Sequence, residues 1–151
     1  MSSAIFIERF KELLACAGKN ENDLAQEANL TLKSVHNWSR GVTYPSPQSL
    51  LILADYFKVS TDYLLGLDSY DEEKICKETL TAEKAQNHLK GYLNEYLKEK
   101  EIKRNRLARL LGTQQGVVAS WLEKGSMPET AMLIKISNLL NKPLDELLGR
   151  K

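Results

Sequence analysis

The stretch NDLAQEANLTLKSVHNWSRGVTYP, residues 22–45, is matched by NRLARLLGTQQGVVASWLEKGSMP, residues 105–128. The two stretches align without a gap when Trp38 is placed on Trp121, an offset of 83 residues (121 − 38). The offset continues downstream, where DYLLG at 62–66 meets DELLG at 145–149. A long period that occurs only twice indicates two copies of a domain, because stacked repeats have shorter periods and recur more often.

The first half of each stretch predicts a short helix followed by a tight turn. Amphipathic segments over 23–28 and 105–111 stop at Asn29 and Gly112. Asn and Gly commonly end helices because they adopt the left-handed conformation at little cost.

A second helix is predicted to follow in each copy. Thr31 and Thr113 are typical helix caps, and the second helix is expected to begin there. In the first copy Val35 and Trp38 lie three residues apart on one apolar face, and the second copy repeats this spacing. A glycine then ends the helix in both copies. Two short helices joined in this way indicate a helix-turn-helix, whose second helix fits the DNA major groove.

Further helices complete each copy. The apolar spacing predicts them over 5–17, 46–57 and 62–65, and over 82–101, 129–140 and 144–148. After the tryptophan, both copies carry a glycine, a proline, a leucine and the sequence DxLLG. This combination resembles the helix-turn-helix family of lambdoid phage repressors and Cro proteins (XRE type), over residues 6–66 and 89–149.

The resemblance implies an all-α fold of two tandem five-helix repressor-like helix-turn-helix domains. They would occupy residues 1–67 and 82–151, joined by an acidic linker over 68–81. It also implies a sequence-specific transcriptional regulator, a repressor, whose partner is double-stranded DNA. The spacer of about 16 residues could stretch to about 55 Å, whereas successive major grooves on one face of DNA lie about 34–36 Å apart. Both copies can therefore reach DNA together. Because the second helices differ between the copies, residues 31–40 against 114–123, one chain is expected to prefer two unlike half-sites.

Charge is distributed unevenly between the copies. Residues 1–67 carry six basic and seven acidic side chains, whereas residues 85–151 carry twelve basic and seven acidic ones. DNA binding depends strongly on cations that neutralise phosphates. The second copy is therefore predicted to bind the DNA backbone more strongly than the first.

The candidate base-contacting residues of the first copy lie on its second helix. Lys33 can bond guanine, Asn37 can bond adenine, and Arg40 can hold a phosphate. Glu21 stands where the resemblance implies a glutamine near a phosphate, and a carboxylate there repels phosphate although it suits a helix N-terminus. The predicted DNA-binding set of this copy is Thr31, Lys33, Ser34, His36, Asn37 and Arg40.

The second copy has strong candidates for phosphate contacts and fewer candidates for base contacts. Arg104 aligns with Glu21 and is predicted to donate to a phosphate. Gln114 and Gln115 can pair with adenine, but Gly116 lies where the resemblance implies a polar side chain. The predicted DNA-binding set of this copy is Lys103, Arg104, Arg106, Gln114, Gln115, Ser120 and Lys124. The second copy is thus expected to contact mainly the DNA backbone, and the first copy is expected to contact mainly the bases.

Other classes of function have little support in the sequence. It contains no glycine-rich phosphate loop, catalytic triad, paired catalytic acids or metal-spaced Cys/His cluster, so no enzymatic activity, cofactor or metal is expected. It has no apolar run of about 18 residues and no signal peptide, which predicts a cytoplasmic protein without a membrane span. Cys16 and Cys76 are expected to be reduced, buried thiols.

One alternative from another class stays open. Glu21 and Gly116 favour a protein-interaction module, an antirepressor- or antitoxin-like adaptor in which one or both copies no longer bind DNA. A protein partner and a homodimer therefore remain alternatives beside DNA.

Overall fold

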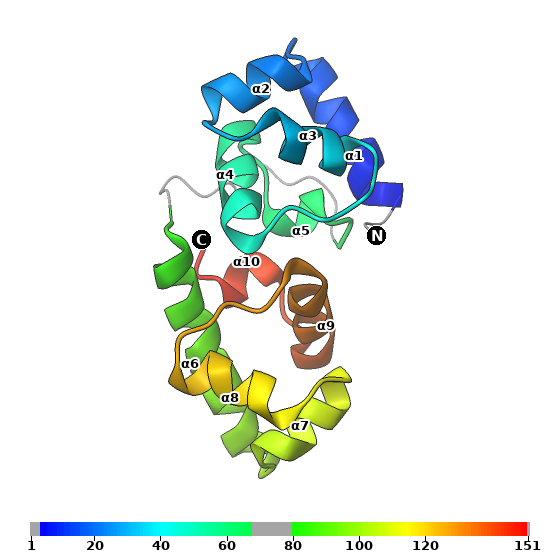
Figure 1. Ribbon diagram of the computed structural model, residues 1–151. Helices are drawn as coiled ribbons and strands as arrows, with labels where there is room; N and C mark the ends of the chain where they lie inside the picture. Colours follow the sequence, from blue (N-terminus) through cyan, green and yellow to red (C-terminus); the bar gives the residue numbers. More distant parts are fainter. Residues whose placement is uncertain (1–3, 68–79, 151) are drawn as a thin grey trace. The chain divides into compact units, whose positions relative to one another are not determined.

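The computed structural model describes residues 4–67 and 80–150, which fall into two compact units divided between residues 79 and 80. The described residues of each unit form five helices and no strand (Figure 1). The predicted all-α class is confirmed. No helix within the described ranges is long and apolar enough to cross a bilayer.

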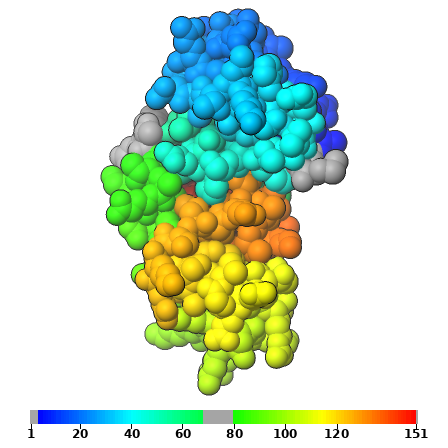
Figure 2. Space-filling model, in the orientation of Figure 1, coloured from blue at the N-terminus to red at the C-terminus, as the bar shows by residue number. Residues whose placement is uncertain are grey.

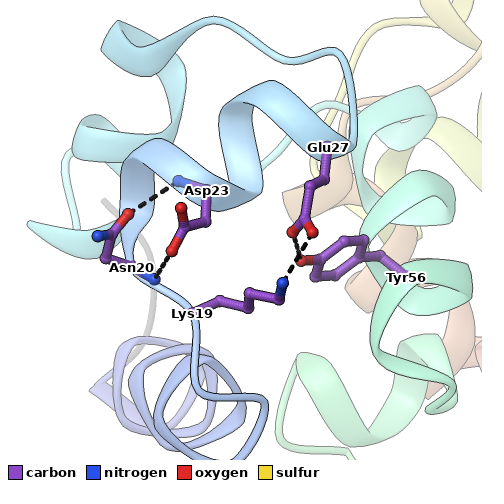
Figure 3. Close-up of polar contacts among 5 residues, drawn as sticks. All are labelled: Lys19, Asn20, Asp23, Glu27 and Tyr56. Carbon is purple, nitrogen blue, oxygen red and sulfur yellow. Dashed lines mark hydrogen bonds and ion pairs between the residues drawn. The ribbon is translucent and has the colours of Figure 1, made fainter.

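Four of the five helices of the first unit begin at polar caps. They are α1 (Ala4–Cys16), α2 (Glu21–Glu27), α3 (Leu32–Ser39), α4 (Pro47–Phe57) and α5 (Thr61–Leu64). The side chains of Asn20, Thr31, Ser46 and Ser60 each accept a hydrogen bond from the backbone N–H three residues later, which fixes the starts of α2 to α5. Asn20 and Asp23 form a reciprocal capping box (Figure 3).

An aromatic cluster fills the core of the first unit. Phe10 of α1 is fully buried and meets Trp38 of α3 edge to face, with ring centroids 6.3 Å apart. It meets Phe57 of α4 in the same manner at 6.2 Å. Such pairs stabilise beyond the area they bury. The cluster therefore fixes α3 against α1 and α4, and leaves the opposite side of α3 at the surface.

The second unit repeats this order of helices. It contains α6 (Ala82–Lys100), α7 (Arg104–Leu111), α8 (Gln115–Glu123), α9 (Thr130–Leu140) and α10 (Leu144–Leu147). Helices α2 to α5 begin at residues 21, 32, 47 and 61, and α7 to α10 begin at 104, 115, 130 and 144, so each pair differs by 83. The α6 helix has 19 residues where α1 has 13.

Aliphatic side chains and buried polar contacts take the place of the aromatic cluster in the second unit. Leu93 stands at the position of Phe10 and is fully buried, as is Val118 of α8. Gln86 of α6 is buried and its amide donates to the Trp121 carbonyl oxygen at 2.6 Å. Near the end of the unit, Arg150 is 3% exposed and pairs with Asp145 at 3.1 Å.

The predicted cap at Thr113 is wrong. The N-cap of α8 is Gln114, which makes no side-chain cap hydrogen bond. The Thr113 N–H instead donates to the Ala108 carbonyl oxygen at 2.8 Å, while Gly112 adopts φ 71°. This is the Schellman arrangement that closes a helix, so Thr113 still belongs to the end of α7. The cap of the next helix therefore lies one residue later than predicted, at Gln114.

The expectation of buried cysteines is also wrong for Cys16, which is exposed. The buried face of α1 carries Phe6, Phe10 and Leu14, and Cys16 lies two residues beyond Leu14 on the far side of the helix. Cys76 and most of the predicted acidic linker, residues 68–79, lie outside the described residues. Of that linker, Leu80 and Thr81 are described, and Thr81 caps α6.

Candidate nucleic-acid interface

The helix-turn-helix of the first unit consists of α2, a tight turn and α3. Asn29 adopts φ 56° in the turn, and the Leu30 N–H donates to the Ala25 carbonyl oxygen at 2.8 Å. Val35 and Trp38 are buried on one side of α3. The other side lies at the surface, where Figure 2 shows the α2–α3 region in blue to cyan. This is the side from which α3 could enter a groove.

Two of the predicted base-contacting side chains are available on this face. Lys33 is exposed and Asn37 is half-buried. Among the described residues, neither side chain forms a hydrogen bond or an ion pair. Their polar ends can therefore bond an external ligand without first breaking a contact within the unit.

Other predicted residues of α3 are engaged in holding the helix. The Thr31 hydroxyl oxygen accepts from the Ser34 N–H at 3.2 Å, and the Thr31 hydroxyl donates to Ser34 Oγ at 2.8 Å. Arg40 is exposed, and its Nε donates weakly to the His36 carbonyl oxygen at 3.4 Å. Thr31 and Ser34 thus have a capping role, which leaves less hydrogen-bonding capacity for DNA.

A charged contact connects α2 with α3. The Glu21 carboxylate, in the first turn of α2, contacts Nδ1 of His36 on α3. Both side chains remain partly accessible to solvent. When His36 is protonated, the contact is an ion pair that offsets the negative charge of Glu21 at the surface.

A charged contact also connects α7 with α8 in the second unit. The Arg104 guanidinium donates to the Glu123 carboxylate. This hydrogen bond, together with the positive charge of Arg104, lowers the pKa of Glu123 below its usual value. Lys103 and Arg106 are exposed beside Arg104, so the first turn of α7 presents cations despite the contact with Glu123.

The outer face of α8 carries small side chains. Gln114 and Gln115 are exposed at its start, followed by Gly116, where an added Cβ would meet nothing within 4 Å. The Ser120 hydroxyl donates to the Val117 carbonyl oxygen at 2.6 Å and is thereby occupied. Lys124 is exposed just beyond the end of α8. Figure 2 shows α7 and α8, in yellow, at the surface of this unit.

The two helices α3 and α8 therefore offer different chemistry at equivalent positions. At the 83-residue offset, Lys33 and Asn37 of α3 correspond to Gly116 and Ser120 of α8. Long polar side chains in the first unit are replaced by a hydrogen atom and a short hydroxyl group. At these two positions the α3 side chains can reach base edges, whereas α8 can do so only if its own main chain comes close. The long polar side chains that the second unit offers for base contacts are Gln114 and Gln115, at the start of α8.

Residues 93–147 match the helix-turn-helix family model. The match runs from within α6 to the end of α10, entirely inside the second unit. The chain is also similar to the HTH-type transcriptional regulator ImmR of Bacillus subtilis (strain 168), with 33% identity over 66 residues. That alignment covers 44% of this chain and 52% of ImmR, so the chain spans about half the length of this relative. No solved structure matches the chain significantly.

Two features of the surface are absent from the predicted set of residues. Glu21 aligns with Arg104, and Glu123 ends α8 beside Lys124, but neither carboxylate belongs to the predicted DNA-binding set. The structure shows that each contacts a predicted DNA-binding residue, His36 and Arg104 respectively. Glu21 and Arg104 carry opposite charges at aligned positions, and this difference in the sequence could have indicated that each has a partner of opposite sign.

Proposed function

We propose that this chain is a sequence-specific transcriptional regulator that binds double-stranded DNA through two helix-turn-helix units and acts as a repressor. The observation that carries the proposal is the family match over residues 93–147. The first unit supports it, because α2 to α5 precede α7 to α10 at a constant offset. The relative ImmR, named as a transcriptional regulator, points to the same class of function.

The second unit supplies most of the binding to the DNA backbone in this proposal. Lys103, Arg104 and Arg106 surround the first turn of α7, where the helix dipole and free N–H groups also favour an anion. Arg104 exchanges its contact with Glu123 for a bidentate contact with a phosphate. Such contacts increase affinity for every DNA sequence alike.

The first unit supplies most of the sequence preference. Lys33 and Asn37 lie on the solvent-facing side of α3, opposite the buried Val35 and Trp38. In the major groove, Lys is suited to guanine and Asn to adenine. Glu21, in the first turn of α2, weakens the attraction of this unit for phosphate.

The proposal predicts the form of the DNA site. Because α3 and α8 differ on their outer faces, one chain should prefer two unlike half-sites. A palindromic site would require two chains, and a homodimer is the corresponding oligomeric state. The number of chains bound to the selected site can be measured by light scattering of the complex.

Selection from a randomised duplex library tests the proposal. The purified full chain is mixed with the library at about 0.15 M salt, where nonspecific electrostatic binding is partly suppressed. Bound duplexes should enrich for one composite sequence, and a promoter overlapping that sequence should be less active when the chain is present. A library that shows no enriched sequence would contradict the proposal, and increased promoter activity would indicate an activator.

The interaction-module alternative applies most directly to the first unit. One observation favours it: the first residue of α2 is an acid, at the position where Arg104 begins α7. In that case only the second unit would bind DNA. The selected sequence would then be a single half-site, and substitutions on α3 would leave DNA affinity unchanged.

A further inference from the structure

A cluster of three polar side chains in the first unit has an apolar counterpart in the second. Lys19 Nζ lies 2.8 Å from the Glu27 carboxylate at the end of α2, and the Tyr56 hydroxyl of α4 donates to the same carboxylate (Figure 3). At the 83-residue offset, Lys19, Glu27 and Tyr56 correspond to Ile102, Leu110 and Leu139. An equivalent place in the fold is thus polar in one unit and apolar in the other.

Two of these apolar side chains, Leu110 and Leu139, line a surface groove. The groove has a volume of about 550 Å³ and lies between the end of α7 (residues 109–112) and the outer side of α9, where Lys135, Asn138 and Leu139 line it. Leu110 is 44% exposed, which is unusual for a leucine of this unit, since the other leucines of α7, Leu107 and Leu111, are buried. Leu110 and Leu139 therefore place two apolar side chains at this surface, beside the polar ends of Lys135 and Asn138.

The charge around the groove has one sign. Arg109 and Lys135 line it, both are exposed, and neither forms an ion pair with another described residue. No Asp or Glu lines the groove. An occupant with carboxylates would therefore be attracted, whereas a second copy presenting the same surface would oppose cations with cations.

We infer that this groove, formed by the end of α7 and by α9, docks an acidic amphipathic helix of a protein partner. Apolar side chains of the partner cover Leu110 and Leu139, and its carboxylates pair with Arg109 and Lys135. This is the helix-in-groove mode of recognition, in which one apolar face provides the contact area and flanking charges set the orientation. Duplex DNA fits less well, because its phosphate backbone offers no apolar group to cover the leucines.

A designed peptide serves as the probe for this groove. The probe is an amphipathic helix with leucine on one face and glutamate on the other. One control peptide carries lysine in place of glutamate, and a second carries alanine in place of leucine. Binding to the full chain is followed by nuclear magnetic resonance at about 0.15 M salt, where the Debye length is about 8 Å. The acidic peptide should bind saturably and shift the amide signals of residues 109–112 and 135–139, and neither control peptide should do so.

Matched variants of the chain decide whether the groove is responsible. The triple variant Ile102→Lys, Leu110→Glu, Leu139→Tyr transfers the polar set of the first unit, so it should fold and lose binding. The double variant Arg109→Glu, Lys135→Glu should weaken binding about tenfold or more, because attraction becomes repulsion at two sites. Lys84→Glu, a charge reversal on an exposed side chain of α6, is the control and should leave binding unchanged.

Several outcomes would overturn the inference. The first is that the acidic peptide does not bind the native chain, and the second is that the lysine peptide binds it equally well. The third is that the acidic peptide binds the double variant as strongly as the native chain. Displacement of the peptide by duplex DNA, with the same amide signals shifted, would assign the groove to nucleic acid instead. The inference does not depend on DNA binding, because the groove residues are distinct from Lys33, Asn37 and Arg104.

Discussion

Glu21 and Arg104 hold the same place in their units, the first residue of α2 and the first residue of α7, and they carry opposite charges. Each contacts the next helix of its own unit: Glu21 meets His36 of α3, and Arg104 meets Glu123 of α8. Each helix pair is therefore connected by a carboxylate and a basic side chain, in reversed order, and the guanidinium of Arg104 is the permanent cation of the two. Only the second unit places the cation at the helix N-terminus, where a phosphate would bind.

Replacing Arg104 by Ala should weaken binding to all duplexes alike. Each phosphate contact contributes about −0.9 to the slope of log K against log salt, so the slope should fall in magnitude by about one. Glu123→Ala is the matched variant, since it frees Arg104 and removes a negative charge, and it should raise affinity. Fluorescence anisotropy over a salt series measures both effects. Equal slopes for the native chain and Arg104→Ala would remove Arg104 from the interface.

Replacing Lys33 or Asn37 by Ala should relax sequence preference. Loss of one base contact costs about 1–3 kcal/mol of discrimination, because the partner group on the base is left unsatisfied. Lys11→Ala, which removes an exposed cation from α1, is the control for general charge loss. The measurement is competition between the selected duplex and a scrambled one. Full discrimination by both variants would show that α3 does not contact bases.

Replacing Trp38 or Trp121 by Ala should destabilise the corresponding unit. Trp38 and Trp121 are 4% and 3% exposed, and loss of a buried aromatic side chain costs about 3–5 kcal/mol of unfolding free energy. Urea denaturation of the full chain measures this change. A loss below about 1 kcal/mol, in the range of surface substitutions, would contradict the packing described for these helices.

The contact between Tyr56 and Glu27 should appear in the pH dependence of stability. Burial, followed by the hydrogen bond to Glu27, raises the pKa of Tyr56 from 10.0 to about 12. The folded state therefore keeps this proton while the unfolded state releases it. The stabilisation is fully present below pH 10 and is lost as pH rises toward 12.

Tyr56→Phe provides the comparison for this effect. The native chain should lose more stability than the variant between pH 10 and 12, because the variant has no proton to release. The same contact acts at low pH, since hydrogen bonds from Lys19 and Tyr56 lower the pKa of Glu27. Stability from Glu27 is then present above the ordinary carboxyl pKa and is lost on acidification. Parallel stability curves for the native chain and Tyr56→Phe at alkaline pH would contradict this account.

The helices were largely predictable from the sequence, because apolar spacing and capping residues act locally. The predicted helix over 46–57 is α4 with Ser46 as its cap, and the predicted helix over 82–101 is α6 with Thr81 as its cap. Thr113 failed as a cap because it aligns with Leu30 rather than with the cap Thr31: its N–H closes α7, and the 83-residue offset places Gln114 at the cap position.

The candidate site was less predictable, because its contacts join residues far apart in the chain. Arg104 and Glu123 are 19 residues apart, and their contact depends on how α7 packs against α8. Arg150 contributes to the positive charge counted for the second copy, yet it is buried against Asp145 and is not part of the surface that DNA would meet. Counting charges in a sequence cannot separate such internal pairs from exposed cations.

The most direct test of the two-unit account is the affinity of the full chain for its selected duplex with about five base pairs inserted between the two halves. Half a helical turn places one half-site on the opposite face of the DNA, so affinity should fall toward that of the better single unit. A second insertion of about five base pairs completes the turn and should restore part of the affinity. Unchanged affinity after both insertions would contradict simultaneous binding of DNA by the two units.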